Sequence, residues 1–447
     1  RHWLGPVGYA DSDGYVEDDP VRLWAYRYRD YVIRSLNADK PFSEFIVEQL
    51  AGDEILNGAL PHASEENTDR LVATGFLRTA PDGTGAGGVD QNVARNDLMA
   101  ETIKIVSTTL LGMTVGCAQC HEHRYDPITQ ADYYRLRAIF EPALDWKAWR
   151  DKNARLISLW TVADYEAATH NDKELQDAQK QYEVALDAIV NEIFEREVAK
   201  LPPEKQPLAR EAKPLAADKR TADQNQLYKE FPSLNVDRGS AYLYEPQKVN
   251  DLNKANEKSQ ADIRAKRPAD NFFACLTEPP EHAPPTHLFA RGDFNQPRQI
   301  IPPGDLSVLP QSSVIPENDA NVTTTGRRLA WARHLTTGQH PLVARVLVNR
   351  VWMHHFGRGI VATPGDFGRL GEQPSHPELL DWLASELTSS GWQLKHLQRA
   401  IVTSAAYRQS SRQRPELAAV DPDNRWLGRM SIRRLEAEAI RDALLAV

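Results

Sequence analysis

The stretch from Val115 to Ile128 constrains this chain more than any other. It reads VGCAQCHEHRYDPI and places Cys117 and Cys120 three positions apart, with His121 directly after the second cysteine. This is the spacing by which c-type haem is attached, because two sulfurs on one helical turn face the same edge of the porphyrin. The adjacent imidazole can then give the iron an axial nitrogen. The pattern predicts covalent haem c, held by Cys117, Cys120 and His121.

A zinc site is the main alternative at the same place. The chain has three cysteines and Cys275 stands alone, so the second cysteine pair of a common zinc site is missing. His121, His123 or Asp126 would have to complete the ligand set. A thioredoxin-type redox pair is less favoured, because such a pair opens a helix after a strand, whereas an apolar, helix-like segment (98–113) precedes these cysteines.

Composition bounds the class of protein. The chain has 447 residues, enough for two or three domains, and its 41% hydrophobic content with ten tryptophans indicates a globular protein. The net charge of -9 argues against a nucleic-acid partner, which would require a basic face. No apolar run approaches the length that crosses a bilayer, so we expect no transmembrane segment.

The ends of the chain and the cysteine spacing bear on its location. The chain opens at Arg1 without a signal segment and stops inside an apparently helical stretch, so we expect both ends to be cut from a longer precursor. Haem is attached to thiols outside the cytoplasmic membrane. The cysteine spacing therefore predicts a periplasmic or extracellular protein.

Hydrophobic periodicity predicts a mainly α protein with two helical domains. The first, residues 1–145, carries amphipathic patterns over 22–37, from Pro41 onward, and over 128–140, where Tyr133, Leu136 and Phe140 should face inward. The second comprises residues 271–447, and we expect it to be truncated at its C-terminus. It opens with apolar runs separated by prolines, which predict a few short strands near 271–310 with a turn at Arg291–Gly292–Asp293.

Residues 146–270 differ from both flanking domains. Lys, Glu, Asp, Gln and Ala dominate, which predicts a charged helical-hairpin insertion. The proline-rich stretch 201–219 is expected to be a connection. The apolar positions of the first arm recur mostly three to four residues apart: Tyr182, Leu186, Ile189, Ile193 and Phe194.

Acidic residues crowd around Gly14 near the start of the chain. Carboxylates at alternate positions before a glycine can hold calcium. A solvated turn that caps the next helix is favoured, because the bidentate glutamate of a calcium loop is missing. The acidic residues are Asp11, Asp13, Glu17, Asp18 and Asp19.

Arginines and carboxylates alternate in the second domain. We expect most of them to form internal ion pairs that hold helices in register. Arginines also suit sulfate or uronate groups, and a pair such as Asp366 with Glu372 could do acid–base work on a polysaccharide. The arginines concerned include Arg345, Arg350, Arg358, Arg369, Arg433, Arg434 and Arg441.

Several long segments resemble a known pair of domains. YADSDGY, PFSEFIVEQLAGD and GMTVGCAQCHEHRYDPITQADYYRLRAIF resemble the DUF1549 domain, also called the planctomycete cytochrome C-like type 2 domain. NRVWMHHFGRGIVATPGDFGRLGEQPSHPELLDWLASEL and SAAYRQSS, with the end of the chain, resemble its partner domain, DUF1553. The resemblance implies a secreted protein, often fused to an upstream cytochrome-c-like domain, without a settled biochemical role. Cys117, Cys120 and His121 match the family's haem-type motif, and His123 and Asp126 match its H-x-x-D extension.

The sixth iron ligand does not follow from this resemblance. Met113 is too close to the cysteine pair along the chain for the role it has in small cytochromes c, and Met353 belongs to the second domain. His354 or His355 would serve if that domain covers the haem, although core or interface roles are more common for such histidines. His376, at a predicted helix N-terminus, would be kept neutral by the helix dipole, which suits a ligand or a base.

Three functions follow in order of preference. The first is an extracytoplasmic haem-c protein that transfers electrons to a redox partner or to the upstream cytochrome-c-like domain. The second is an enzyme or binding module for polysaccharide or its sulfated derivatives, with zinc or calcium as the metal if one is used. The third is a binding scaffold in which the cysteine pair carries no haem and the charged insertion contacts a partner.

Overall fold

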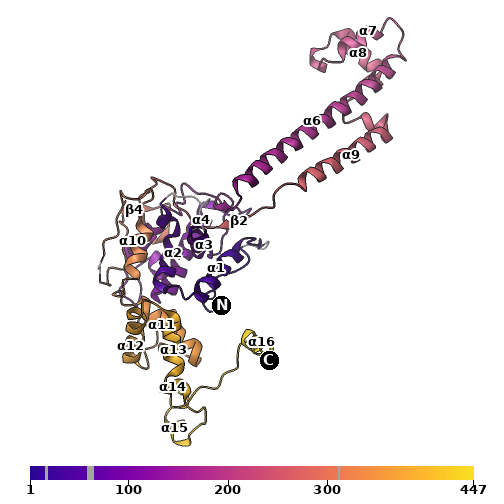
Figure 1. Cartoon of the computed structure of the whole chain (residues 1–447). Coiled ribbons are helices and arrows are strands. Elements are labelled where there is room, and N and C mark those ends of the chain that lie inside the picture. Colours follow the sequence, from indigo (N-terminus) through magenta and orange to yellow (C-terminus); the bar gives the residue numbers. More distant parts are fainter. Residues whose placement is uncertain (16–18, 58–64, 311–312) are drawn as a thin grey trace. The chain divides into compact units, whose positions relative to one another are not determined.

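The computed structural model describes residues 1–15, 19–57, 65–310 and 313–447. Helices dominate these residues, and two small two-stranded sheets accompany them (Figure 1). The prediction of a mainly α chain with a few short strands is therefore confirmed. No helix of the described part combines the length and the apolar composition that crossing a bilayer requires.

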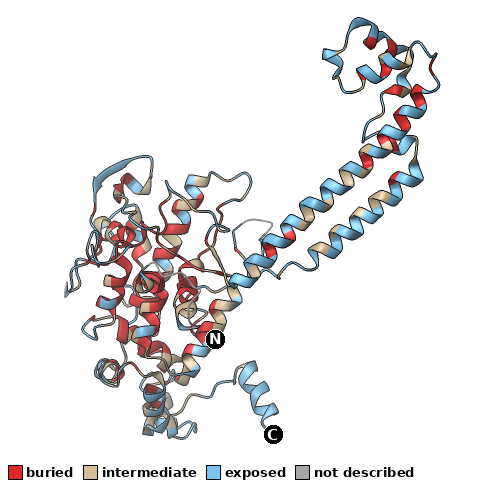
Figure 2. Cartoon of the chain, turned by 45° about the horizontal axis from the view of Figure 1, so that its top comes forward, coloured by how far each residue is buried: buried red, intermediate tan, exposed pale blue. Residues whose placement is uncertain are grey.

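The chain divides into two compact units. Unit 1 comprises Arg1–Leu159 and Phe272–Val447, and unit 2 comprises Trp160–Asn271. Unit 1 therefore contains both segments that were expected to be separate helical domains. Its core is one cluster that includes Phe45 and Phe140 from the first segment and Trp331 from the second, and Figure 2 shows this concentration of buried residues.

The first segment of unit 1 is helical, and most residues of its helix α2 are buried. Side chains cap the helix starts: Asp90 accepts hydrogen bonds from the first turn of α4, and Thr129 forms a capping box with Asp132 in α5. The residues of α5 that were predicted to face inward, Tyr133, Leu136 and Phe140, are buried. The elements are α1 Ala25–Asn37, α2 Phe42–Leu56, α3 Glu65–Ala73, η1 Thr74–Arg78, α4 Gln91–Val106, η2 Ser107–Leu111, η3 Val115–Gln119 and α5 Gln130–Phe140.

The second segment of unit 1 is also helical. Its α12 begins at Pro377 with His376 as the N-cap residue, so the helix N-terminus predicted at His376 is present. The Ser375 hydroxyl donates to the carbonyl of Ile360. The helices are α10 Arg327–Leu335, α11 Val343–Phe356, α12 Pro377–Ser389, α13 Leu394–Thr403, α14 Ala405–Arg408, α15 Pro415–Val420 and α16 Ala437–Leu445.

Two antiparallel strand pairs complete unit 1. The predicted strands near 271–310 are β2 Phe272–Ala274, β3 His287–Phe289 and β4 Pro297–Ile300. β3 pairs with β4, and the predicted turn between them is present as η7 Ala290–Gly292. β2 pairs with β1 Leu156–Ser158, a strand that the sequence analysis did not predict.

Unit 2 contains the predicted charged hairpin. α6 Val162–Val198 and α9 Pro246–Arg264 lie side by side as its two arms, and Figure 2 shows them mostly exposed. The stretch 201–219 is more than a connection, because α7 Gln206–Ala212 and η4 Ala217–Lys219 lie within it. A small second core around Phe194, Val198 and Leu227 includes residues of α7, α8 Ala222–Glu230 and η5 Pro232–Leu234. The remaining short element is η6 Ala241–Leu243.

A buried ion-pair cluster joins the two segments of unit 1. The Arg328 guanidinium of α10 is fully buried and donates two hydrogen bonds of 2.8 Å to the two carboxylate oxygens of Asp53 in α2. Glu54 lies 3.3 Å and Glu278 3.6 Å from the same guanidinium. Burial raises the pKa of Glu54 to about 8, with Arg328 opposing the shift and Glu278 and Asp53 adding to it. Burial therefore favours the protonated form of the Glu54 carboxyl.

Arg328→Met should destabilise unit 1 strongly. Removing one partner of a buried ion pair leaves the other charges uncompensated, which typically costs about 3–5 kcal/mol. The free energy of unfolding, measured with denaturant, checks this. Arg358→Met is the matched control, because Arg358 forms an exposed pair with Glu372 and should change stability by only about 0.5 kcal/mol. Equal effects of the two variants would contradict the assignment.

Unit 1 should fold without unit 2. Ser158 and Phe272 are paired residues of β1 and β2, so the ends of unit 1 that flank unit 2 lie next to each other. Replacing residues 160–271 by a short turn that contains glycine should leave a protein with one cooperative thermal transition. Circular dichroism and size-exclusion chromatography check this. An aggregated product or a transition without cooperativity would contradict it.

Candidate functional site

The cysteine pair lies on an exposed, tight turn. Cys117 belongs to the 3₁₀ turn η3 and Cys120 directly follows it, with α-helical backbone angles. Because a 3₁₀ turn has about three residues per turn, side chains three apart project from the same side. Both thiols are exposed and neither is in a disulfide. The turn therefore presents two free thiols on one side to solvent.

Buried contacts hold this turn in place from behind. Val115 and Ala118 are completely buried and belong to the core of unit 1. The carbonyl of Gln119 accepts hydrogen bonds from the Gln130 amide at 3.0 Å and from the Tyr134 hydroxyl at 3.2 Å, both on α5. The thiols thus stand on a turn whose backbone is fixed by packing and by α5.

Gly292 closes one flank of the turn. A Cβ atom added at Gly292 would lie 2.7 Å from the Cys120 sulfur, and the φ of +77° also favours glycine. The β3–β4 connection therefore passes directly over Cys120. The sequence analysis predicted a turn at this position but not its approach to the cysteine, because no local pattern links residues so far apart.

His121 is exposed and has one nitrogen free for a ligand role. Its Nδ1 lies 2.6 Å from the carbonyl oxygen of Glu122. A carbonyl can only accept, so Nδ1 carries the proton and Nε2 keeps its lone pair. The Glu122 carboxylate accepts from the backbone N–H of Gln130 at the start of α5, at 3.0 Å. The His121 tautomer with its proton on Nδ1 leaves Nε2 free, as an axial haem ligand requires.

His123 and Asp126 serve a different purpose from His121. The Nδ1 of His123 accepts the backbone N–H of Asp126 at 2.9 Å, and its Nε2 lies 3.2 Å from the Thr114 hydroxyl. The Asp126 carboxylate accepts the backbone N–H of Arg369 at 2.7 Å and lies against Gly368. The pair thus fastens the loop after α11 to the cysteine turn, and both nitrogens of His123 are engaged.

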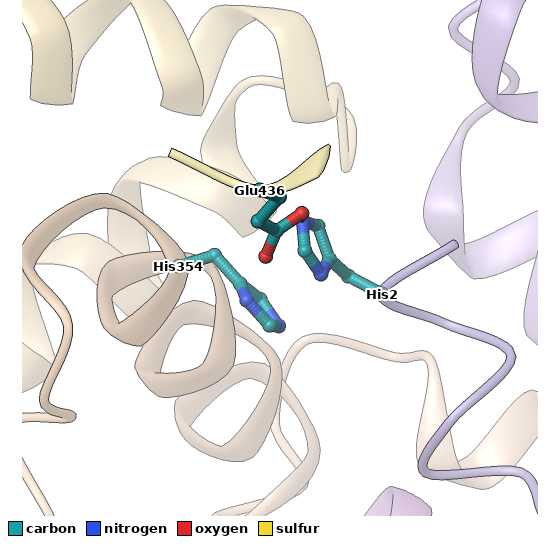
Figure 3. Close-up of side chains that lie close together, drawn as sticks. All are labelled: His2, His354 and Glu436. Atoms are coloured by element: carbon teal, nitrogen blue, oxygen red, sulfur yellow. The ribbon is translucent and has the colours of Figure 1, made fainter. Parts of the chain in front are cut away.

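The other predicted histidines lie in different surroundings. His354 stacks on His2, with ring centroids 3.7 Å apart, and the two rings lie beside Glu436 (Figure 3). The planes are within 24° of parallel, so the nitrogen lone pairs do not converge on one point. His355 contacts Tyr407, and His376 contacts Ser375 and Trp426.

The surroundings of Met113 and Met353 do not favour either residue as an iron ligand. Met113 is buried in the core of unit 1, and Met353 lines a surface groove together with His354.

A preformed zinc site does not surround the thiols. Among the described residues, two groups of three metal-binding side chains have ligand atoms close enough for one ion, and neither contains Cys117 or Cys120. One group is His2, His354 and Glu436. The other is Asp305, His334 and His340.

The buried Asp305 group is held by hydrogen bonds. The Nε2 atoms of His334 and His340 lie 3.4 Å and 3.3 Å from the same Asp305 oxygen. The Nδ1 of His340 accepts the backbone N–H groups of Leu342 and Val343, so its Nε2 carries the proton and faces the carboxylate. Burial opposes ionisation, but the two histidine hydrogen bonds outweigh it and lower the pKa of Asp305. No local pattern in the sequence indicates this group, because it forms only through long-range packing.

One of the acidic residues around Gly14, Asp13, forms buried ion pairs, whereas Asp11 and Asp19 are exposed. Asp13 is buried, and its two oxygens lie 2.9 Å from Arg22 and 2.8 Å from Lys152. The prediction of a solvated turn is therefore wrong for Asp13. Asp11 accepts from the Tyr9 hydroxyl and Asp19 from the backbone N–H of Gly14. Glu17 and Asp18 lie outside the described residues.

The arginines of the second segment follow the ion-pair prediction in part. Arg345 pairs with Asp381, and Arg358 pairs with Glu372 at 2.7 Å. Arg350 is an exception, because it donates to the backbone carbonyls of Thr108, Thr109 and Pro364. The Asp366 carboxylate accepts the backbone N–H of Gly368.

Two family models match the chain. Residues 1–144 match PSCyt2, described as a protein of unknown function (DUF1549), and residues 327–447 match PSD1, described as a protein of unknown function (DUF1553). The expected resemblance to this pair of domains is therefore confirmed. A search of curated proteins and a search of solved structures found no match.

Protonation of the stacked histidine pair should destabilise the protein. Burial, with the neighbouring His2, lowers the pKa of His354 to about 4, below the ordinary value of 6.5. The unfolded chain therefore binds more protons between these values, so stability is lost as the pH falls from 6.5 to 4. His354→Phe keeps a ring in the stack but cannot titrate, and it should make the melting temperature fall less over this range. His170→Phe, at an exposed position of unit 2, is the control. Equal slopes for all three proteins would contradict the assignment.

Proposed function

In a chain that carries a DUF1549 domain and a DUF1553 domain, we propose that Cys117, Cys120 and His121 bind haem c and that the protein transfers electrons. One observation carries the proposal. A single exposed turn presents two free thiols on one side and is followed by an imidazole whose Nε2 lone pair is free. Covalent haem attachment requires this set of groups at this spacing.

The chain's own residues have distinct roles in this proposal. Cys117 and Cys120 form the thioether bonds, and the Nε2 of His121 is the axial ligand. The hydrogen bond from Nδ1 to the Glu122 carbonyl fixes the ring orientation and increases the basicity of Nε2. The bound group would supply one-electron redox chemistry.

The surroundings of the turn support rigid positioning of these groups. Val115 and Ala118 anchor the turn in the core, and the Gln119 carbonyl is held by α5. The His123–Asp126 pair adds a tether to the second segment of unit 1. Ligands on a fixed backbone reorganise little when the charge on the iron changes, which favours fast electron exchange.

Exposure of the turn suits exchange with another redox centre. Both cysteines and His121 lie at the surface, so a partner can approach closely. We propose a redox partner protein or an upstream cytochrome-c-like domain for this role. Because haem is attached to thiols outside the cytoplasmic membrane, the proposal also implies a periplasmic or extracellular location.

Spectroscopy after export with a cytochrome-c maturation system tests the proposal. The full chain should give a pyridine haemochrome spectrum of a c-type haem that stays with the denatured polypeptide. The double variant Cys117→Ser/Cys120→Ser should lose this covalent band. His121→Ala should alter the spectrum of the native protein.

Cys275→Ser is the matched control. The Cys275 thiol is buried away from solvent, so its replacement should leave the haem band unchanged. Absence of the covalent band from the unaltered chain would refute haem binding. Stoichiometric zinc without iron in that protein would favour the metal-site alternative.

A further inference from the structure

Unit 1 contains a cavity of about 170 Å³ whose lining includes no residue of the cysteine turn. This is far above the roughly 15 Å³ that one water molecule needs. Much of the wall is apolar or aromatic, with Tyr9, Trp24 and Tyr28 contributing rings. The cavity can therefore hold a small organic molecule.

Positive charges outnumber negative charges at the wall of this cavity. Arg22, Arg78 and Lys152 line it, and Asp13 is the one carboxylate in its described lining. Arg22 and Lys152 share Asp13, at 2.9 Å and 2.8 Å. Arg78 takes no part in that pair.

Arg78 has a weak partner and an unused donor. Its Nη2 lies 3.6 Å from Asp82, whose other carboxylate oxygen accepts from the hydroxyl and the backbone N–H of Thr84. The Nη1 of Arg78 is buried without a hydrogen-bond partner. A buried N–H group left unpaired is costly, so this donor is suited to an acceptor from outside the chain.

A second unsatisfied guanidinium lies close to the first. Arg155 is 3% exposed, and its Nε and Nη1 have no hydrogen-bond partner. Its guanidinium stacks on Trp149, 4.1 Å from the ring centroid, which fixes it without neutralising it. Burial, together with the nearby Arg78 and Arg150, lowers the pKa of Arg155 to about 8.

Asp82, which lies 3.6 Å from Arg78, offsets only part of these charges. Burial raises the pKa of the nearby Cys275 thiol to about 12, so it stays neutral. Arg150 donates to the backbone and hydroxyl oxygens of Thr277 rather than to a carboxylate. By contrast, Arg328 in the same unit lies close to the acidic side chains of Asp53, Glu54 and Glu278. Positive charge is therefore less fully offset at this cavity than around Arg328.

We propose that this cavity binds a small organic oxyanion, one that carries a sulfate, phosphate or carboxylate group. Arg78 donates to the oxyanion, Lys152 contacts it from the wall, and Arg155 stabilises it through its charge. The carbon skeleton lies against the rings of Tyr9 and Trp24. Guanidinium groups bind all three oxyanions through charge-assisted hydrogen bonds, so the test separates them.

Binding is tested on the full chain with sodium sulfate, sodium phosphate and sodium acetate as probes, at constant ionic strength set with sodium chloride. At about 100 times Kd, one of these anions should raise the melting temperature by roughly 2–5 °C in a saturable manner. Calorimetric titration should give a matching Kd, and the order of affinities identifies the oxyanion class.

Three variants separate a site from a general salt effect. Arg78→Gln should weaken binding by about 10-fold or more, because a charged hydrogen bond is lost. Arg155→Met should abolish most of the anion-induced shift and should not lower the melting temperature in anion-free buffer, since it removes an unpaired buried charge. Lys152→Gln, at a half-exposed position, gives a readout if the buried variants fold poorly.

Arg358→Gln is the matched control, because this exposed arginine lies outside the cavity. It should retain the full shift. A shift that does not saturate, or one of equal size in Arg78→Gln, Lys152→Gln and Arg358→Gln, would overturn the proposal. The absence of any shift beyond that of chloride would overturn it as well.

Discussion

The pairing of Arg328 with the carboxylates of α2 is the interaction on which unit 1 depends. The fully buried guanidinium of one sequence segment lies against Asp53 and Glu54 of the other segment. The pairing is therefore buried on both sides. The apolar faces around it close into one core. In this chain the segments that match DUF1549 and DUF1553 share one core and belong to one compact unit. Each segment alone would expose both a core face and unpaired buried charges.

The same arrangement explains how a surface turn is kept rigid. The cysteine turn belongs to the first segment, yet its tether is the contact of Asp126 with the backbone of Arg369 in the second segment. The His123–Asp126 pair of the H-x-x-D extension therefore connects the two segments. Of the histidines at 121 and 123, His121 is the one with a nitrogen that makes no hydrogen bond. A chain that lost the second segment would keep the cysteine spacing but not its orientation.

Local sequence patterns predicted most helices, but the roles of individual side chains depend on contacts between residues far apart in the chain. The periodicity of Tyr133, Leu136 and Phe140 is a property of one helix and was readable from sequence, as was the tight spacing of the two cysteines. The burial of Asp13 was not, because its neutralising partner Lys152 lies far along the chain. Gly292 over Cys120 and the Asp305–His334–His340 group were hidden for the same reason. The prolines of the stretch 201–219 led to the prediction of a simple connection. The helix α7 lies within this stretch and adjoins a small core.

The unusual ionisation of Glu54 has a consequence for the acid–base behaviour of the whole fold. Since its pKa is raised to about 8 in the native state, folding at neutral pH takes up a proton that the unfolded carboxyl would have released. That uptake penalises the native state increasingly as the solution becomes alkaline, up to the native pKa. The stacked His2 and His354 act in the opposite sense, since they resist protonation on the acidic side. Between pH 4.5 and 6.5 the two effects on stability oppose each other. Between pH 6.5 and 8 the Glu54 effect remains, so the stability of the native state falls as the pH rises.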